Sequence, residues 1–134
     1  MLTIGQVASR AEVGVETVRF YEREGLLEKA ARRPSGYRQF DEGVVARLAF
    51  IRRAKSLGFT LKEVRELLSL RLDPDGPTAE VKRRAEAKIT DIEAKIRTLR
   101  KMKTSLTRLT KACPGHGRTA DCPILEALEG RVKL

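Results

Sequence analysis

The chain has 134 residues, and its 28 Lys and Arg against 18 Asp and Glu give a formal net charge of +10, which favours polyanionic partners such as nucleic acid. The chain has no Trp and few Phe, so it lacks the aromatic residues of a membrane-binding amphipathic helix. We see no signal peptide, and no apolar run approaches the roughly 20 residues that span a bilayer. These features argue against a membrane role. We therefore expect a cytoplasmic protein.

Residues 1–72 are predicted to form short helices separated by turns. Thr3 with Gln6 makes a capping-box pattern that opens the first helix. A tight turn then leads to a second helix over Glu16–Glu24, which Gly25 ends. Two short helices joined by a tight, glycine-containing turn are the outline of a helix-turn-helix.

The second helix offers polar side chains for DNA recognition. Val18 and Phe20 are expected to face a small core. The groups expected to contact base edges and phosphates in a major groove are Thr17, Arg19, Tyr21 and Arg23.

A short β-hairpin, or wing, is expected after this helix. Pro34-Ser35-Gly36 supplies the turn, and the residues that follow it alternate as in a strand. Tyr37 and Arg38 would then set an aromatic ring and a guanidinium against the DNA backbone.

Two more helices and a hinge complete the first part. Asp41 is predicted to cap the third helix, and Thr60 with Glu63 forms a second capping box. Residues 73–77 contain two prolines and a glycine, which cannot continue a helix, so they are predicted to form a hinge.

Residues 78–112 contain no Gly or Pro and are predicted to form one helix, roughly 50 Å long at 1.5 Å per residue. Its apolar stripe, which steps by three or four residues, is Val81, Ala85, Ile89, Ile92, Ile96, Leu99, Met102, Leu106, Leu109 and Cys113. The preceding helices are too short to cover so long a stripe. We therefore expect a homodimer in which two copies of this helix pair as an antiparallel coiled coil.

Cys113 and Cys122 flank eight residues that include two glycines, so the loop can fold back and bring both sulfur atoms onto one ion. Cys122 precedes Pro123, a favoured first helical residue, and a helix N-terminus favours a thiolate. Thiolates select soft ions such as Cu(I) and Hg(II), and two of them satisfy a linear ion but not tetrahedral zinc. His116 as a third ligand, a regulatory disulfide and two unrelated thiols remain alternatives.

The chain contains the stretches Thr3–Ala8, Val15–Glu22, Gly25–Leu27, Gly36–Arg38, Leu48–Arg52, Leu57–Leu61 and Glu63–Leu68. With the linker, long helix and cysteine tail, these stretches resemble the MerR family of transcription regulators over essentially the whole chain. The resemblance implies a mainly α protein with a winged helix-turn-helix DNA-binding domain (1–72), a hinge (73–77), a dimerisation helix (78–112) and a metal-binding loop with a short helix (113–134).

The same resemblance implies a mode of action. A homodimer would bind double-stranded promoter DNA whose two promoter elements are spaced too widely for RNA polymerase to use. Bound effector would make the dimer kink and untwist this DNA so that RNA polymerase can use it, and specificity would come partly from DNA deformation.

Within the family, the chain resembles the copper-efflux (CueR-type) branch most. Sensors of divalent ions carry a further cysteine at the start of the long helix, where the copper-efflux branch has serine and this chain has Thr78. The loop between Cys113 and Cys122 is one residue longer than in that branch and has the spacing of the mercury and zinc types. The resemblance implies an activator that responds to Cu(I), or to Ag(I) and Au(I), with Thr78 and His116 as neighbours of the metal site.

Other functions are compatible with the same residues. Mercury or another divalent soft metal could recruit His116, or oxidation could form a Cys113–Cys122 disulfide. A basic coiled-coil scaffold would bind DNA without sequence preference. An enzyme is not expected, because the sequence has no evident nucleophile–base pair, phosphate loop or paired carboxylates.

Overall fold

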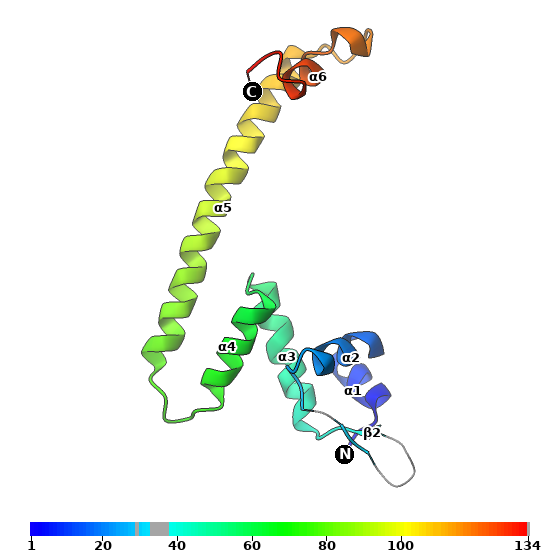
Figure 1. Cartoon of the computed structure of the whole chain (residues 1–134), viewed down its shortest axis with the longest axis vertical. Coiled ribbons are helices and arrows are strands. Elements are labelled where there is room, and N and C mark those ends of the chain that lie inside the picture. Colours follow the sequence, from blue (N-terminus) through cyan, green and yellow to red (C-terminus); the bar gives the residue numbers. More distant parts are fainter. Residues whose placement is uncertain (29, 33–37, 134) are drawn as a thin grey trace. The chain divides into compact units, whose positions relative to one another are not determined.

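The computed structural model describes residues 1–28, 30–32 and 38–133, and it is mainly helical (Figure 1). Two compact units, Met1–Val81 and Lys82–Leu134, divide the chain. The helices are α1 Ile4–Ala11, α2 Val15–Arg23, α3 Gly43–Ser56, α4 Leu61–Arg71, α5 Thr78–Ala112 and α6 Pro123–Leu128, with a 3-10 turn at Thr119–Asp121. Strands β1 Ala31–Arg32 and β2 Arg38–Gln39 form a small hairpin. Within the described ranges, no helix is long and apolar enough to cross a membrane.

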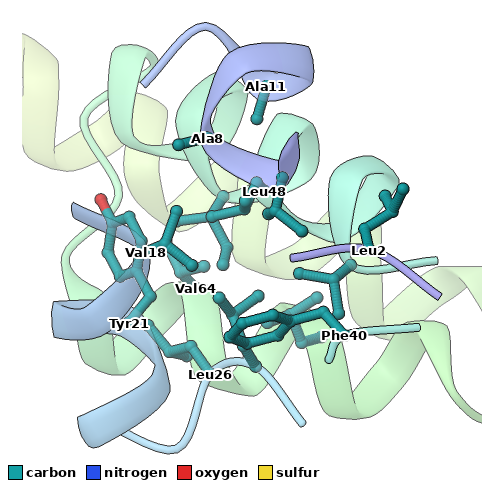
Figure 2. Packing of buried hydrophobic residues seen from close by; sticks show 14 of the residues in the cluster. Leu2, Ala8, Ala11, Val18, Tyr21, Leu26, Phe40, Leu48 and Val64 are labelled. Atoms are coloured by element: carbon teal, nitrogen blue, oxygen red, sulfur yellow. The ribbon is translucent and has the colours of Figure 1, made fainter. Parts of the chain in front are cut away.

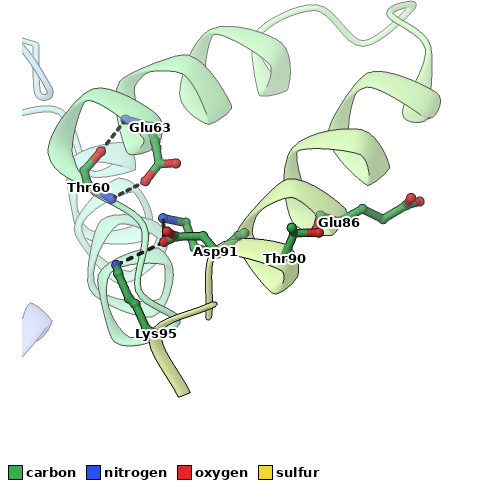
Figure 3. Close-up of polar contacts among 7 residues, drawn as sticks. Thr60, Glu63, Glu86, Thr90, Asp91 and Lys95 are labelled. Atoms are coloured by element: carbon green, nitrogen blue, oxygen red, sulfur yellow. Dashed lines mark hydrogen bonds and ion pairs between the residues drawn. The ribbon is translucent and has the colours of Figure 1, made fainter. Parts of the chain in front are cut away.

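Two helices of the first unit begin with the capping boxes that the sequence predicts. The Thr3 hydroxyl accepts a hydrogen bond of 3.2 Å from the Gln6 backbone N–H, and the Gln6 side chain accepts one of 2.9 Å from the Thr3 backbone N–H. Thr60 and Glu63 form the same reciprocal pair at the start of α4, at 3.2 and 2.8 Å (Figure 3). Each box satisfies two backbone donors at or near the helix start.

Two helix starts lie close to, but not at, their predicted positions. Helix α2 begins at Val15 instead of Glu16. At α3 the N-cap position belongs to Glu42, while Asp41 Oδ1 accepts a hydrogen bond of 3.0 Å from the Gly43 backbone N–H. Asp41 therefore satisfies a donor at this helix start from the residue before the N-cap.

Helix α2 ends in a Schellman motif, which reverses the chain. The backbone N–H of Gly25 bonds to the Glu22 carbonyl oxygen at 3.1 Å, and that of Leu26 bonds to the Tyr21 carbonyl oxygen at 3.0 Å. Gly25 has a φ of 75°, a left-handed conformation that glycine adopts without steric cost. The reversal carries Leu26, which is 2% exposed, into the core.

The predicted hairpin is present. Ala31 pairs with Gln39 and Arg32 with Arg38 in antiparallel register, and the turn residues 33–37 lie outside the described residues. The sequence did not predict a further bridge, in which the backbones of Leu2 and Phe40 exchange hydrogen bonds of 2.8 and 2.7 Å. This bridge ties the hairpin to the segment that leads into α1.

The core of the first unit lies among helices α1 to α4 and the end of the hairpin (Figure 2). Its large fully buried side chains are Phe40, Leu48, Ile51, Val7, Val18 and Val64. Burying one such side chain contributes about 1.5–3 kcal/mol to folding. Because each of the helices α1 to α4 supplies at least one of them, the helix-turn-helix, α3 and α4 form one packed body.

The second unit contains most of α5, the 3-10 turn and α6. Helix α5 begins and ends at the residues that the sequence predicts. Helix α6 lies beside the C-terminal end of α5 (Figure 1), where Leu109 and Ala127 are 7% and 4% exposed. Most other apolar side chains of α5 are exposed.

Candidate functional site

Helix α2 presents an outward polar face. Arg19 and Arg23 are exposed, and Thr17 is half-buried. The Arg19 guanidinium donates to Glu16 Oε1 at 2.7 Å, and its side chain remains 49% exposed. Two of the predicted DNA-contacting residues, Arg19 and Arg23, therefore lie on the exposed face of α2, and Thr17 lies at the edge of that face.

The two aromatic residues of α2 are reversed relative to the prediction. Tyr21 is 9% exposed and belongs to the core (Figure 2), whereas Phe20 is 38% exposed. Their ring centroids lie 5.4 Å apart. The physical reason is helical spacing: Tyr21 follows Val18 by three residues and shares its face, whereas Phe20 lies about 200° away around the helix. The expectation that Phe20 faces the core and Tyr21 faces outward was wrong.

The wing residues are only partly described. The backbone of Arg38 lies in β2, opposite Arg32. Tyr37 lies outside the described residues, so its predicted role in DNA binding stays a prediction.

Sequence reasoning missed three polar side chains that hold the helix-turn-helix in place. The Glu22 carboxylate, in a residue 6% exposed, accepts a hydrogen bond of 2.9 Å from the Ala30 backbone N–H. Arg52 of α3 donates to the carbonyl oxygen of Ala11, the last residue of α1, at 2.7 Å. Arg65 of α4 makes the equivalent bond to the residue after α2. The four-residue spacing of Glu22 from Val18 could have indicated that Glu22 is buried. The two arginine contacts each join residues 41 positions apart, so no local sequence pattern indicates them.

Both cysteines are half-buried free thiols at the ends of the predicted loop. Cys113 follows the last residue of α5, and Cys122 occupies the N-cap position of α6. Pro123 is the first helical residue, as predicted, and the Cys122 carbonyl oxygen accepts a hydrogen bond of 3.0 Å from the Glu126 backbone N–H. The order of the chain therefore sets one thiol at the end of α5 and the other at the start of α6.

The two predicted neighbours of the metal site are both exposed. His116 lies within the loop, and among the described residues no group of three His, Cys, Asp or Glu side chains is arranged to hold an ion. Thr78 is the first residue of α5 and belongs to the first compact unit, whereas the cysteines belong to the second. Their roles as neighbours of a metal stay predictions.

A helix-turn-helix followed by a hairpin and a long helix defines a winged-helix DNA-binding protein. The family model described as MerR HTH family regulatory protein matches residues 2–70, and the model described as MerR, DNA binding matches residues 45–109. The chain belongs to the MerR family of transcription regulators, and it is a regulator rather than an enzyme.

Individual relatives match over almost the full chain. The chain is 43% identical to the transcriptional regulator ZntR of Escherichia coli K12 over 131 residues, covering 96% of this chain and 93% of that protein. It is 39% identical to the regulator CueR of Escherichia coli O157:H7 over 129 residues, covering 96% and 95%. The crystal structure of PbrR691 from Ralstonia metallidurans CH34 in complex with lead(II) superposes with a TM-score of 0.86 at 38% identity, covering 96% and 99%. The family thus includes regulators that bind metal ions.

Proposed function

We propose that this chain is a cytoplasmic transcription activator that binds promoter DNA as a homodimer and responds to Cu(I), or to Ag(I) or Au(I) in its place. The metal would bind the thiolates of Cys113 and Cys122. The dimer would then distort the promoter so that RNA polymerase can start transcription. In this scheme residues 1–72 bind DNA, 73–77 act as a hinge, 78–112 dimerise and 113–134 sense the metal.

The choice of metal rests on the side chains that are available as ligands. Cys113 and Cys122 are free and half-buried, and His116 is exposed. In the ranges that the structure describes, neither thiol is part of a cluster of three His, Cys, Asp or Glu ligands. Two thiolates suit a linear, soft, monovalent ion, whereas zinc prefers four ligands. A metal held by both thiolates would link the end of α5 to the start of α6.

A divalent metal is the second candidate effector. One observation favours it: the similar structure of PbrR691 contains lead(II). In this chain such an ion would need a third ligand, for which His116 in the loop between the cysteines is the candidate. The exposed position of His116 makes the two-thiolate site the better supported proposal.

An exposed apolar stripe on α5 supports the homodimer. Five consecutive members of this stripe, Ile92, Ile96, Leu99, Met102 and Leu106, are 38% to 61% exposed. A contiguous apolar strip of this length marks an interaction surface, and a second copy provides a matching one.

The charges of α5 favour an antiparallel pair. Residues 95–112 contain seven Lys and Arg and no Asp or Glu, whereas residues 78–94 contain four of each sign. A parallel pair would set the two strongly positive halves against each other. An antiparallel pair sets each positive half beside a half that carries four acidic residues, which lowers the repulsion.

The DNA-contacting set follows from the outward face of α2 and from the hairpin. Arg19, Arg23 and Thr17 are proposed for the major groove, and Arg38 with Tyr37 for the backbone beside it. Because the ring of Tyr21 lies in the core, only its hydroxyl group is proposed as a DNA contact.

The decisive experiment titrates purified protein with Cu(I) and with Hg(II) against a strong competing chelator, and repeats both titrations with Cys113→Ser. We expect Cu(I) to bind far more tightly than to a glutathione-like thiol, and the variant to lose this affinity. Transcription from a promoter fragment that the protein protects should rise with Cu(I) for wild type only. Copper affinity no better than that of a simple thiol would overturn the copper proposal, and activation by oxidation without metal would replace it with a redox mechanism.

A further inference from the structure

Glu22 brings a carboxylate into the interior of the DNA-binding unit. In the described part of the chain, Glu22 and Lys88 are the charged residues that are buried, each 6% exposed. Glu22 lies on the inward face of α2, four residues after Val18 and next to Tyr21. Its Oε2 accepts a hydrogen bond of 2.9 Å from the Ala30 backbone N–H.

A buried carboxylate is unfavourable compared with an apolar side chain of the same length, unless hydrogen bonds compensate the lost hydration. An apolar residue at this position would fill the core beside Tyr21 without that cost. The presence of glutamate therefore has to be explained by what its oxygen atoms bind. One of the contacts of the Glu22 carboxylate is to a backbone donor outside the helix, the Ala30 N–H.

The two ends of this contact belong to different parts of the DNA-binding surface. Glu22 is in α2, whose outward face carries Arg19 and Arg23. Ala30 directly precedes β1, and β1 pairs with the strand that contains Arg38. The hydrogen bond therefore runs from the recognition helix to the base of the hairpin.

The other contacts near the hairpin base are mainly apolar, and Ala30 itself is half-buried against the core, so the hydrogen bond from its N–H to Glu22 adds a directional contact. The chain reverses at Gly25, which has a left-handed backbone conformation, and glycine also adopts other φ angles without steric cost. Leu26 and Leu27 anchor the loop in the core, but they lie three or more residues before Ala30. The bridge between Leu2 and Phe40 holds the far strand rather than β1.

We propose that Glu22 is a positioning residue for DNA recognition, because its buried carboxylate fixes the first strand of the hairpin to the recognition helix so that both contact DNA in one geometry. This inference rests on the proposed DNA-binding function. Glu22 itself does not touch DNA in this scheme. Its loss would leave both parts folded but free to move relative to each other, which weakens sequence-selective binding more than nonspecific attraction to phosphates.

The test compares wild type with Glu22→Met in the full-length chain, because methionine keeps the length of the side chain without a strong acceptor. The operator is the duplex that wild-type protein selects from a random pool. The affinity of Glu22→Met for this operator should fall about tenfold or more, because a hydrogen bond to a charged group is lost. Its affinity for an unrelated duplex should change less than about twofold. Hydrogen exchange should accelerate at the Ala30 amide but not at the amides of α2.

Two further variants separate positioning from charge and folding. Glu28→Met removes an exposed carboxylate from the same loop and should leave operator preference unchanged. Glu22→Gln keeps an acceptor oxygen and should retain both the protection of the Ala30 amide and the operator preference. If Glu22→Met does not fold, Glu22→Gln decides the question alone.

Wild-type operator preference in folded Glu22→Met, or a loss of preference in Glu22→Gln, would overturn the positioning role. An equal loss of affinity for operator and unrelated DNA would do so too, because it indicates general destabilisation. Failure of the wild-type protein to select any operator would instead contradict the proposed function, so the two failures are distinguishable.

Discussion

Arg65 of α4 donates a hydrogen bond of 2.7 Å to the backbone carbonyl oxygen of Glu24, the C-cap residue of α2. Its guanidinium also lies 3.9 Å from the Glu24 carboxylate, and both side chains are about half exposed. A cation at a helix C-terminus satisfies a carbonyl that has no partner within the helix and interacts favourably with the helix dipole. Arg65 thus joins α4 to the C-terminal end of α2.

We expect Arg65→Gln to lower the free energy of unfolding by about 1 kcal/mol, at the low end for a charged hydrogen bond because the site is half exposed. Urea denaturation followed by circular dichroism measures this change. Arg71→Gln, an exposed arginine at the end of α4, is the matched control and should shift stability by less than about 0.5 kcal/mol. Equal effects of the two substitutions would show that the contact with Glu24 contributes nothing specific.

The sequence predicts those parts of the fold that depend on neighbouring residues. The capping boxes at Thr3 and Thr60 are local patterns, and both are present. The length of α5 follows from the absence of Gly and Pro in residues 78–112. Pro123 at the start of α6 is a preference of the first helical turn.

The parts that could not be predicted depend on contacts between residues far apart in sequence. The positions of Phe20 and Tyr21 are an exception, because the three-residue spacing of Tyr21 from Val18 already indicates which ring shares the buried face of α2. The contact of Arg52 with Ala11 spans 41 positions. At the proposed metal site, the sequence predicts the two thiols and their loop, but the choice of ion depends on ligand number and geometry, which residue types alone do not determine.

Substitution on the apolar stripe of α5 should dissociate the proposed dimer. In Ile96→Lys, each copy loses the burial of one isoleucine, about 1.5 kcal/mol per copy, so the dissociation constant should rise about a hundredfold. Light scattering coupled to size-exclusion chromatography over a concentration series measures this. Ala94→Lys places the same charge on an exposed residue off the stripe and should leave the dimer intact. Dimers of Ile96→Lys as stable as wild type would exclude this face as the interface.

Acid should weaken α5 through Asp91. Its carboxylate lies 3.0 Å from Lys95 Nζ (Figure 3) and 3.4 Å from Lys88 Nζ. The hydrogen bond from Lys95, with a further contribution from Lys88, holds the pKa of Asp91 below its ordinary value of 3.8. Because the folded pKa is lower than the unfolded one, the stabilisation is complete above pH 3.8 and is lost as the pH falls through the folded value.

When the pH falls below 3.8, the thermal midpoint of Asp91→Asn should therefore fall less than that of wild type. Circular dichroism of the helical signal during heating, at about 0.1 M salt, measures this difference. Lys95→Gln removes the principal donor and should have the same effect. Identical acid profiles for all three proteins would show that solvent screens these ion pairs completely.

The role of His116 separates the two candidate effectors. His116 is exposed, and no described cluster of three His, Cys, Asp or Glu residues includes it, so the two-thiolate site should not depend on it. His116→Ala should keep the Cu(I) affinity within about twofold, whereas Cys122→Ser should lose it, because loss of even an outer-shell partner costs about tenfold or more. Competition titrations of the three proteins with Cu(I) and Hg(II) measure both affinities. A fall of about tenfold in Cu(I) affinity for His116→Ala would make the imidazole a ligand, and the argument from two thiolates to a monovalent ion would then fail.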